Sequence, residues 1–317
     1  SLIKQLRKEG FNAYDASVAP QGSAWDRACE LYAQLTGTIT DYGKEHSERC
    51  GHERFGRDFS KEPLITQWDE EYKINLLGHS FGGVTVRLLA HLMANGSEAE
   101  RAVTDKDDLS PLFAGGHGDW IYSVTTLAAP HNGTSAYHVP DENPQPKSNM
   151  QKLMDKTNAP KKDGRADYDY ADYDMYIQNA KEINQWLKTV DSVYYFSYSC
   201  SATEASEEGN QVPIEGMMEK LFQRSAVRMG AFRGQTPDGI KLDQSWQEND
   251  GLVNTISALY PEFAPHEDFE EGAILKKGLW YVMPVYKGDH MSLQGGLTIK
   301  NDVRSFYLEH LNMINSL

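Results

Sequence analysis

Residues 73–83 read Lys-Ile-Asn-Leu-Leu-Gly-His-Ser-Phe-Gly-Gly, a short apolar run followed by the pattern Gly-x-Ser-x-Gly. The run at 73–77 predicts a buried strand. The residues after it predict a helix that ends at Asn95-Gly96, because the apolar side chains fall on one face: Val84, Leu88, Leu89, Leu92 and Met93. A serine between such a strand and helix is typical of a sharp turn that presents its hydroxyl at the tip. The alternative is a glycine-rich turn with an ordinary exposed Ser80.

The composition indicates a globular chain that carries excess negative charge. The 317 residues include 31 basic and 46 acidic side chains, a formal net charge of −15. This charge argues against nucleic acid as a partner and against tight adsorption to anionic lipid. No apolar run approaches the roughly 18 residues of a transmembrane anchor, and Ser1-Leu2-Ile3-Lys4 leads into a predicted helix rather than a signal peptide. Three scattered cysteines, Cys29, Cys50 and Cys200, do not indicate a disulfide framework.

The wider pattern predicts an α/β fold with a mostly parallel sheet covered by helices on both faces. Predicted helices cover 2–10, 25–35 and 302–314, and predicted strands cover 12–16, 121–128, 192–199 and 278–285. Residues 38–61 show no clear period. Residues 134–172 are polar, rich in proline, and predict a loop or insertion.

A serine nucleophile needs a base, and the base needs a carboxylate that holds its tautomer. In folds with this type of turn the chain order is Ser, then Asp or Glu, then His. His290 follows a predicted strand and glycine, which is where such a base belongs, and Asp250 lies in a turn before an apolar run. His266, in an acidic loop, and His310, inside the last predicted helix and expected at the surface, are the alternatives.

Several longer motifs occur in the same order. Ser80 is followed by Leu-Ser-Pro-Leu-Phe at 109–113, by Ser-Val-Thr-Thr-Leu-Ala at 123–128, by Glu-Asn-Asp-Gly at 248–251 and by Asp289-His290. With these motifs the chain resembles the secreted bacterial lipases of the thermophilic-bacillus and staphylococcal type. The similarity runs from about Gly10 to the C-terminus, apart from 134–172.

The resemblance implies a single α/β-hydrolase domain over 1–317, with insertions at about 36–62 and 134–190. It implies a Ser80–Asp250–His290 triad that hydrolyses carboxylic esters of glycerides, with the backbone N–H of Phe81 as one oxyanion donor. It also implies an extracellular location and, at most, transient contact with a lipid surface.

The same family carries a structural zinc site beside the sheet. Its motifs match Trp-Asp-Arg-Ala-Cys at 25–29, Asp-Tyr-Gly-x-x-His at 41–46 and Gly-His-x-Arg-Phe-Gly at 51–56, with a distal acid. The implied ligands of Zn²⁺ are Asp26, His46, His52 and Asp174. Two imidazoles and two carboxylates make a closed tetrahedral set, which suits a structural role. Cys50 and Asp41 are nearby competitors.

The chain differs from the family pattern in three features. The acidic and proline ligands of the family's calcium site fall at Ser292, Leu297 and Thr298, which supply no carboxylate, although Gly216 matches a backbone ligand. The family's long apolar lid corresponds to the shorter, polar stretch 134–172, a reduced lid that leaves shorter or more soluble esters open as substrates. The strand whose loop carries the second oxyanion donor would precede Ser1.

The leading hypothesis is therefore a serine ester hydrolase of the lipase type with Zn²⁺ as its cofactor. Another acyl hydrolase on the same fold, such as a phospholipase or thioesterase, is an alternative. A non-catalytic, zinc-stabilised binding protein is a third hypothesis.

Overall fold

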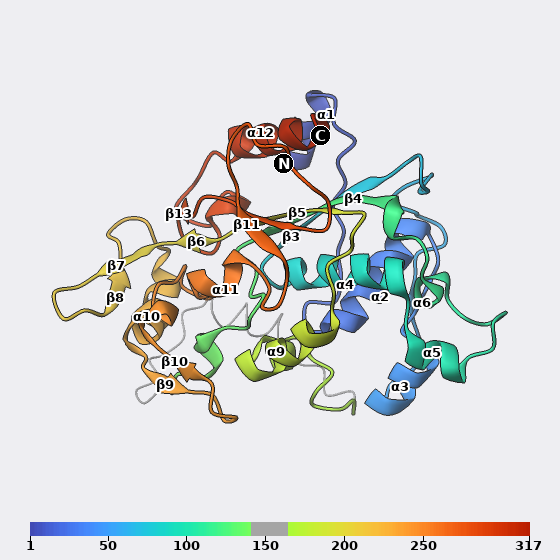
Figure 1. The fold of residues 1–317 in the computed structure, drawn as a ribbon, viewed down its shortest axis with the longest axis horizontal. Coiled ribbons are helices and arrows are strands. Elements are labelled where there is room, and N and C mark those ends of the chain that lie inside the picture. Colours follow the sequence, from blue (N-terminus) through green and yellow to red (C-terminus); the bar gives the residue numbers. More distant parts are fainter. Residues whose placement is uncertain (141–163) are drawn as a thin grey trace.

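The computed structural model describes residues 1–140 and 164–317, and a parallel sheet forms the centre of this part (Figure 1). Within the described residues the sheet has five strands in the order β11-β12-β5-β4-β3, and every neighbouring pair is parallel. The strands are β3 (Ile74–His79), β4 (Ile121–Leu127), β5 (Tyr194–Tyr198), β11 (His266–Asp268) and β12 (Trp280–Val282). Parallel strands have their carboxyl ends at one edge, so the loops that follow β3, β4 and β5 emerge on the same side of the molecule.

Helices cover both faces of this sheet. On one face α2 (Ala24–Thr36) and α4 (Phe81–Asn95) pack against the strands with a core that includes Leu89 and Val124. On the other face α1 (Leu2–Lys8) and α12 (Arg304–Asn315) lie together, with Phe196 and Tyr307 in a second core cluster. Figure 1 shows these two layers above and below the strands. The arrangement confirms the predicted α/β fold with helices on both faces.

Shorter elements surround the sheet. They comprise β1 (Ile39–Asp41), α3 (Lys44–Cys50), β2 (Phe55–Asp58), α5 (Glu98–Val103), α6 (Pro111–Ala114), α8 (Ala171–Met175), α9 (Ile177–Trp186), β6 (Cys200–Ser201), β7 (Thr203–Ala205), β8 (Gln211–Pro213), α10 (Lys220–Ala231), β9 (Gly234–Gln235), β10 (Lys241–Leu242), α11 (Thr255–Leu259) and β13 (Tyr286–Lys287). Residues 38–61, which show no clear period in sequence, thus contain two antiparallel strands with the helix α3 between them. Among these elements, α3 carries His46, and Glu219 immediately precedes α10.

The predicted elements and the observed ones agree except at one place. The strand predicted at 12–16 is absent, and this stretch has no regular structure. The Ala13 carbonyl accepts a hydrogen bond from Arg7 Nε of α1 at 2.8 Å, whereas in a strand it would accept one from a neighbouring strand. The three cysteines are free and buried, as expected without a disulfide framework.

Residues 141–163 of the predicted lid stretch lie outside the described residues. The described flanks contain a short 3-10 turn at Ser135–Tyr137 and the helices α8 and α9. No helix in 1–140 or 164–317 combines the length and apolar character needed to cross a bilayer.

Candidate active site and metal centre

Ser80 lies at the turn between β3 and α4, in a backbone conformation that a side chain rarely adopts. Its φ is 55° and its ψ is −132°. The turn is tight because a Cβ at Gly78 would lie 2.2 Å from the Gly82 carbonyl oxygen, and one at Gly83 would lie 2.4 Å from Ala129 Cβ. Strained residues of this kind persist where the surrounding structure holds them, and they cluster at functional sites. The geometry is that of a nucleophile elbow.

The elbow also puts Ser80 at the amino end of α4. Phe81 is the first helical residue, and the first N–H groups of a helix have no partner within the helix. These groups and the helix dipole favour negative charge at this end. The backbone N–H of Phe81 therefore belongs to a set of donors suited to a developing oxyanion.

Two side chains from distant segments complete a hydrogen-bonded chain with Ser80. His290 Nε2 lies 2.9 Å from Ser80 Oγ, and His290 Nδ1 lies 2.8 Å from Asp250 Oδ2. The other carboxylate oxygen of Asp250 accepts the N–H groups of Leu252 and Val253 at 3.0 and 2.8 Å. Asp250 and His290 are buried, whereas Ser80 is partly exposed. The structure thus brings together the three residues expected from chain order, with the nucleophile facing solvent.

A second histidine supports the first. His79 Nε2 donates to the backbone carbonyl of His290 at 2.6 Å, and the two rings lie 4.8 Å apart. Burial, together with the neighbouring His290, lowers the pKa of His79 to about 4, so this ring is a neutral donor. Phe222 of α10 contacts His290 edge-on, with ring centroids 6.3 Å apart.

The alternative bases lie elsewhere. His266 is exposed on β11 and stacks on Tyr260. The sequence predicts His310 at the surface, but the structure buries it, with only 3% of the residue exposed. Its Nε2 lies 2.7 Å from Thr125 Oγ1 and its Nδ1 lies 2.8 Å from the hydroxyl of Tyr198. His310 is buried because this face of α12 packs on β4 and β5, where the two hydroxyls hydrogen-bond to both ring nitrogens.

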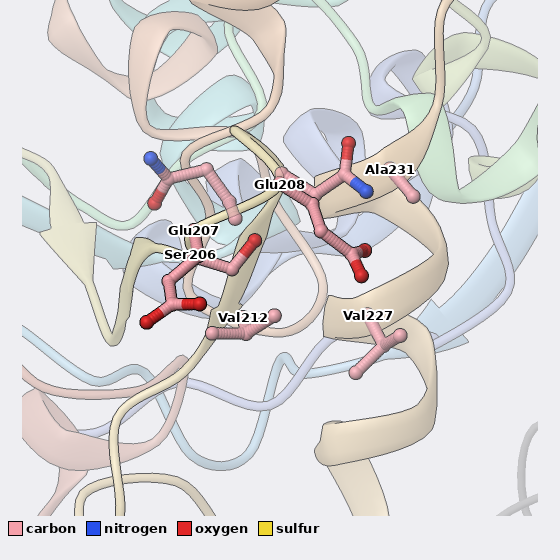
Figure 2. A pocket seen from close by; sticks show the side chains of 8 residues that line it. Ser206, Glu207, Glu208, Val212, Val227 and Ala231 are labelled. Carbon is pink, nitrogen blue, oxygen red and sulfur yellow. The ribbon is translucent and has the colours of Figure 1, made fainter.

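Two hollows lie beside α10, away from this chain of hydrogen bonds. The one in Figure 2, with a volume of about 380 Å³, lies between α10 and the β7–β8 hairpin, and Glu208, Val212 and Val227 line it. The other, of about 580 Å³, shares Val227 and is lined by Gln223 and Gly216. Neither is lined by Ser80, Asp250 or His290, so neither is the candidate active site.

A cluster of imidazole and carboxylate groups joins three distant segments of the chain. His46 Nε2 lies 3.0 Å from Asp26 Oδ1 and 3.3 Å from Asp169 Oδ1. His52 Nε2 lies 3.2 Å from Asp169 Oδ2 and 3.8 Å from Asp26 Oδ1. A tetrahedral Zn²⁺ with bonds of about 2.0–2.1 Å places its ligand atoms roughly 3.3 Å apart. The spacing within the cluster therefore fits such an ion.

The protonation of the cluster also fits a cation. His52 Nδ1 lies 2.8 Å from the Glu53 carbonyl, which assigns the proton to Nδ1 and leaves the buried Nε2 facing the Asp169 carboxylate at 3.2 Å, outside regular hydrogen-bond geometry. Burial opposes a charge on His46, but Asp169 and Asp26 outweigh it and raise the pKa of His46 to about 11. The two histidines in turn hold the pKa of Asp169 well below its usual range despite its burial. This pocket favours positive charge, and Arg165 supplies part of it, with Nη1 at 2.7 Å from Asp26 Oδ2 and 3.4 Å from Asp169 Oδ2.

Asp169, rather than the Asp174 that the resemblance implies, forms the ion-pair contacts with His46 and His52. Asp174 lies close enough to interact electrostatically with His46. Asp174 Oδ2 accepts the backbone N–H of Ala24 at 2.7 Å, and burial raises the pKa of its carboxyl to about 7. Asp169 lies five residues earlier, before α8, between the two imidazoles. Asp41 also lies outside the cluster, because Arg54 forms two hydrogen bonds to its carboxylate.

Cys50 remains close to the cluster. Its sulfur lies 3.8 Å from His46 Nδ1, the ring nitrogen that faces away from the two carboxylates. One ligand atom each from His46, Cys50, His52 and Asp169 lies within 4.8 Å of the others, so these residues form a possible metal-binding group.

A residue that sequence reasoning missed holds His46 in place. The carboxylate of Glu100, on α5, accepts the N–H groups of Glu45 and His46 at 3.0 and 2.8 Å. It thereby caps the amino end of α3, where a carboxylate is favourable. No local sequence signal reveals this cap, since Glu100 is more than fifty residues away along the chain.

Comparisons with known proteins agree with this geometry. A family model described as "Lipase-like, C-terminal domain" matches residues 1–145. A lipase of Staphylococcus hyicus is 32% identical over 100% of this chain and 52% of its own length. The structure of EstA from Clostridium botulinum matches with a TM-score of 0.85 and 30% identity, covering 100% of this chain and 81% of EstA. Lipase 1 from Pelosinus fermentans matches with a TM-score of 0.81 and 30% identity, covering 100% and 92%. The chain belongs to the bacterial lipase family.

The membership confirms the resemblance to staphylococcal lipases drawn from the motifs, and it confirms the α/β-hydrolase fold. The chain spans about half the length of the curated lipases that it matches. The lipase-family chain also carries two buried carboxylates near the metal cluster that the quoted motifs do not include, Asp169 and Glu100. Each acts across the tertiary structure, which explains why a reading of motifs misses it.

Proposed function

We propose that this chain is a serine hydrolase of carboxylic esters, with glycerides as the expected substrates. The observation that carries the proposal is the hydrogen-bonded series Ser80–His290–Asp250, in which a strained, partly exposed serine meets a buried imidazole held by a buried carboxylate. The relatives named lipases and EstA support the same class of substrate.

In the proposed reaction, Ser80 Oγ attacks the ester carbonyl while His290 Nε2 accepts its proton. Asp250 keeps the other imidazole proton on Nδ1 and stabilises the imidazolium that forms. The N–H of Phe81 donates to the oxyanion, and His290 then protonates the leaving alcohol. Water, activated by the same imidazole, hydrolyses the acyl-serine and restores the free enzyme.

A series of p-nitrophenyl acyl esters of increasing chain length tests this proposal. We expect turnover that the Ser80→Ala variant loses, and covalent labelling of Ser80 by a fluorophosphonate probe. An intact protein that shows no Ser80-dependent turnover at any chain length contradicts the proposal. Comparison with phospholipid and thioester substrates separates ester hydrolysis from the other acyl hydrolases.

We further propose that Asp26, His46, His52 and Asp169 hold a structural Zn²⁺. The supporting observations are the spacing of the ligand atoms and the buried Nε2 of His52, which faces the two carboxylates. Bound there, the ion would cross-link α2, the segment around α3 and the residues before α8. Such a cross-link stabilises the fold and takes no part in the ester chemistry.

We also propose that the protein acts outside the cell, as the family resemblance implies. An immunoblot of culture medium and of washed cells tests this location. Recovery of the protein only with the cells contradicts it.

A further inference from the structure

The side chain of Glu219, immediately before α10, binds the loop that follows His290. One carboxylate oxygen accepts three consecutive backbone N–H groups, those of Leu297, Thr298 and Ile299, at 2.9, 2.6 and 2.7 Å. The other oxygen accepts the hydroxyl of Thr298. Glu219 is 2% exposed. A buried carboxylate with four donors is fully satisfied and fixes the groups that it joins.

The backbone of Glu219 holds the same loop at its other end. Its N–H donates to Asp289 Oδ2 at 2.8 Å, and Asp289 Oδ1 accepts the N–H of Met291 and the hydroxyl of Ser292 at 3.0 and 3.1 Å. His290 lies between Asp289 and Met291, so Glu219 binds the chain on both sides of it.

The loop is shaped to present these donors. Gly296 has a φ of 73°, and a Cβ there would lie 1.8 Å from the Ile299 carbonyl oxygen. This closed turn points the N–H groups of 297–299 at one spot, an arrangement that favours an anion and disfavours a cation. Burial opposes the charge of Glu219, but Thr298 and the loop N–H groups outweigh it and lower the pKa of this carboxyl.

The positions that correspond to the family's acidic calcium ligands donate hydrogen bonds to the carboxylates of Glu219 and Asp289. Leu297 and Thr298 donate backbone N–H groups to Glu219, and Ser292 donates its hydroxyl to Asp289. Here hydrogen bonds of Glu219 link the start of α10 to the loop.

We propose that Glu219 is a positioning residue, which fixes the loop around His290 and so sets the imidazole between Ser80 and Asp250. The proposal rests on the proposed role of His290 as the base. Its contribution does not require contact with substrate.

The test compares Glu219→Gln and Glu219→Ala with Glu215→Gln, a matched control that alters an exposed carboxylate in the same connection. Amide hydrogen exchange of peptides covering 287–299 reports on the loop without any substrate. Steady-state kinetics with a short p-nitrophenyl ester, measured well below the melting temperature, report on the base. We expect faster exchange in the loop and a kcat about 10- to 100-fold lower with little change in KM, more in the alanine than in the glutamine variant. The control should match the wild type.

Any of three results for the Glu219 variants would overturn the proposal. These are unchanged hydrogen exchange in the loop, a wild-type kcat with only a lower melting temperature, and a loss of activity that comes from a higher KM alone. Wild-type protein without Ser80-dependent turnover is a different result. It would refute the proposed ester hydrolysis, while the exchange data would still decide whether Glu219 holds the loop.

Discussion

Asp250 and His290 are joined twice. The carboxylate of Asp250 lies 2.8 Å from Nδ1 of the imidazole, and its backbone carbonyl accepts the N–H of His290 at 2.9 Å. The first contact sets the tautomer and the second sets the position of the loop. Because the second uses only backbone atoms, a substitution of the side chain can change the tautomer while the geometry remains.

We therefore expect Asp250→Asn to lower kcat by about 10⁴-fold with little effect on stability. The asparagine carbonyl can still accept from Leu252 and Val253, which turns its amide donor toward His290 Nδ1 and leaves the proton on Nε2. An imidazole in that state cannot accept the proton of Ser80. Ester kinetics and thermal unfolding check this, with the exposed Asp268→Asn as control. A kcat within tenfold of wild type would refute the role of Asp250.

The glycines of the turn at Ser80 differ in their tolerance of a side chain. Gly78→Ala should lower the free energy of unfolding by about 1–3 kcal/mol, because its Cβ meets the backbone of Gly82. Gly82→Ala is the matched control within the same motif. Its Cβ meets nothing within 4 Å and its φ is not positive, so we expect a change of less than about 1 kcal/mol. Equal losses in urea unfolding would contradict the steric account.

Local patterns predicted the parts of the fold that depend on local chemistry. The apolar run before Ser80 and the helical face after it gave β3 and α4, because burial alone imposes those periods. Chain order pointed to Asp250 and His290, since loops at the carboxyl edge of a parallel sheet meet. The strand expected at 12–16 failed because a strand also needs a partner, which the pattern does not supply.

The features that local patterns do not predict depend on distance in space. Tyr168-Asp169-Tyr170 and Tyr173-Asp174-Met175 look alike in sequence, and only the tertiary structure places Asp169 between the imidazoles. His310 occupies a helix with ordinary polar spacing, and its partners Thr125 and Tyr198 come from strands far along the chain. No local pattern encodes such pairs.

The metal assignment predicts different behaviour for two neighbouring aspartates. Asp169→Asn should weaken zinc binding at least about tenfold, because it removes a proposed ligand. Asp174→Asn should leave it unchanged, since its carbonyl can keep the bond from Ala24. Zinc content after dialysis against a competing chelator, together with the melting temperature, checks both. Loss of zinc in Asp174→Asn with full retention in Asp169→Asn would restore the motif-based assignment.

The buried His310 predicts a loss of stability in acid. Burial lowers its pKa to about 4, against an ordinary value of 6.5. Between these values the unfolded chain binds a proton that the folded chain does not, so the free energy of unfolding falls as the pH drops from about 6.5 toward 4. The gap corresponds to about 3 kcal/mol.

His310→Gln removes this proton and isolates the contribution of His310. Above pH 7 the variant should be less stable than wild type, because the fit against Thr125 and Tyr198 changes. As the pH falls toward 4, wild type should lose stability faster and the difference between the two should narrow. Both proteins keep all the other histidines, so acid effects on those groups cancel in the comparison. Urea unfolding across this range measures the two slopes, and parallel slopes would show that His310 is protonated alike in the folded and unfolded states.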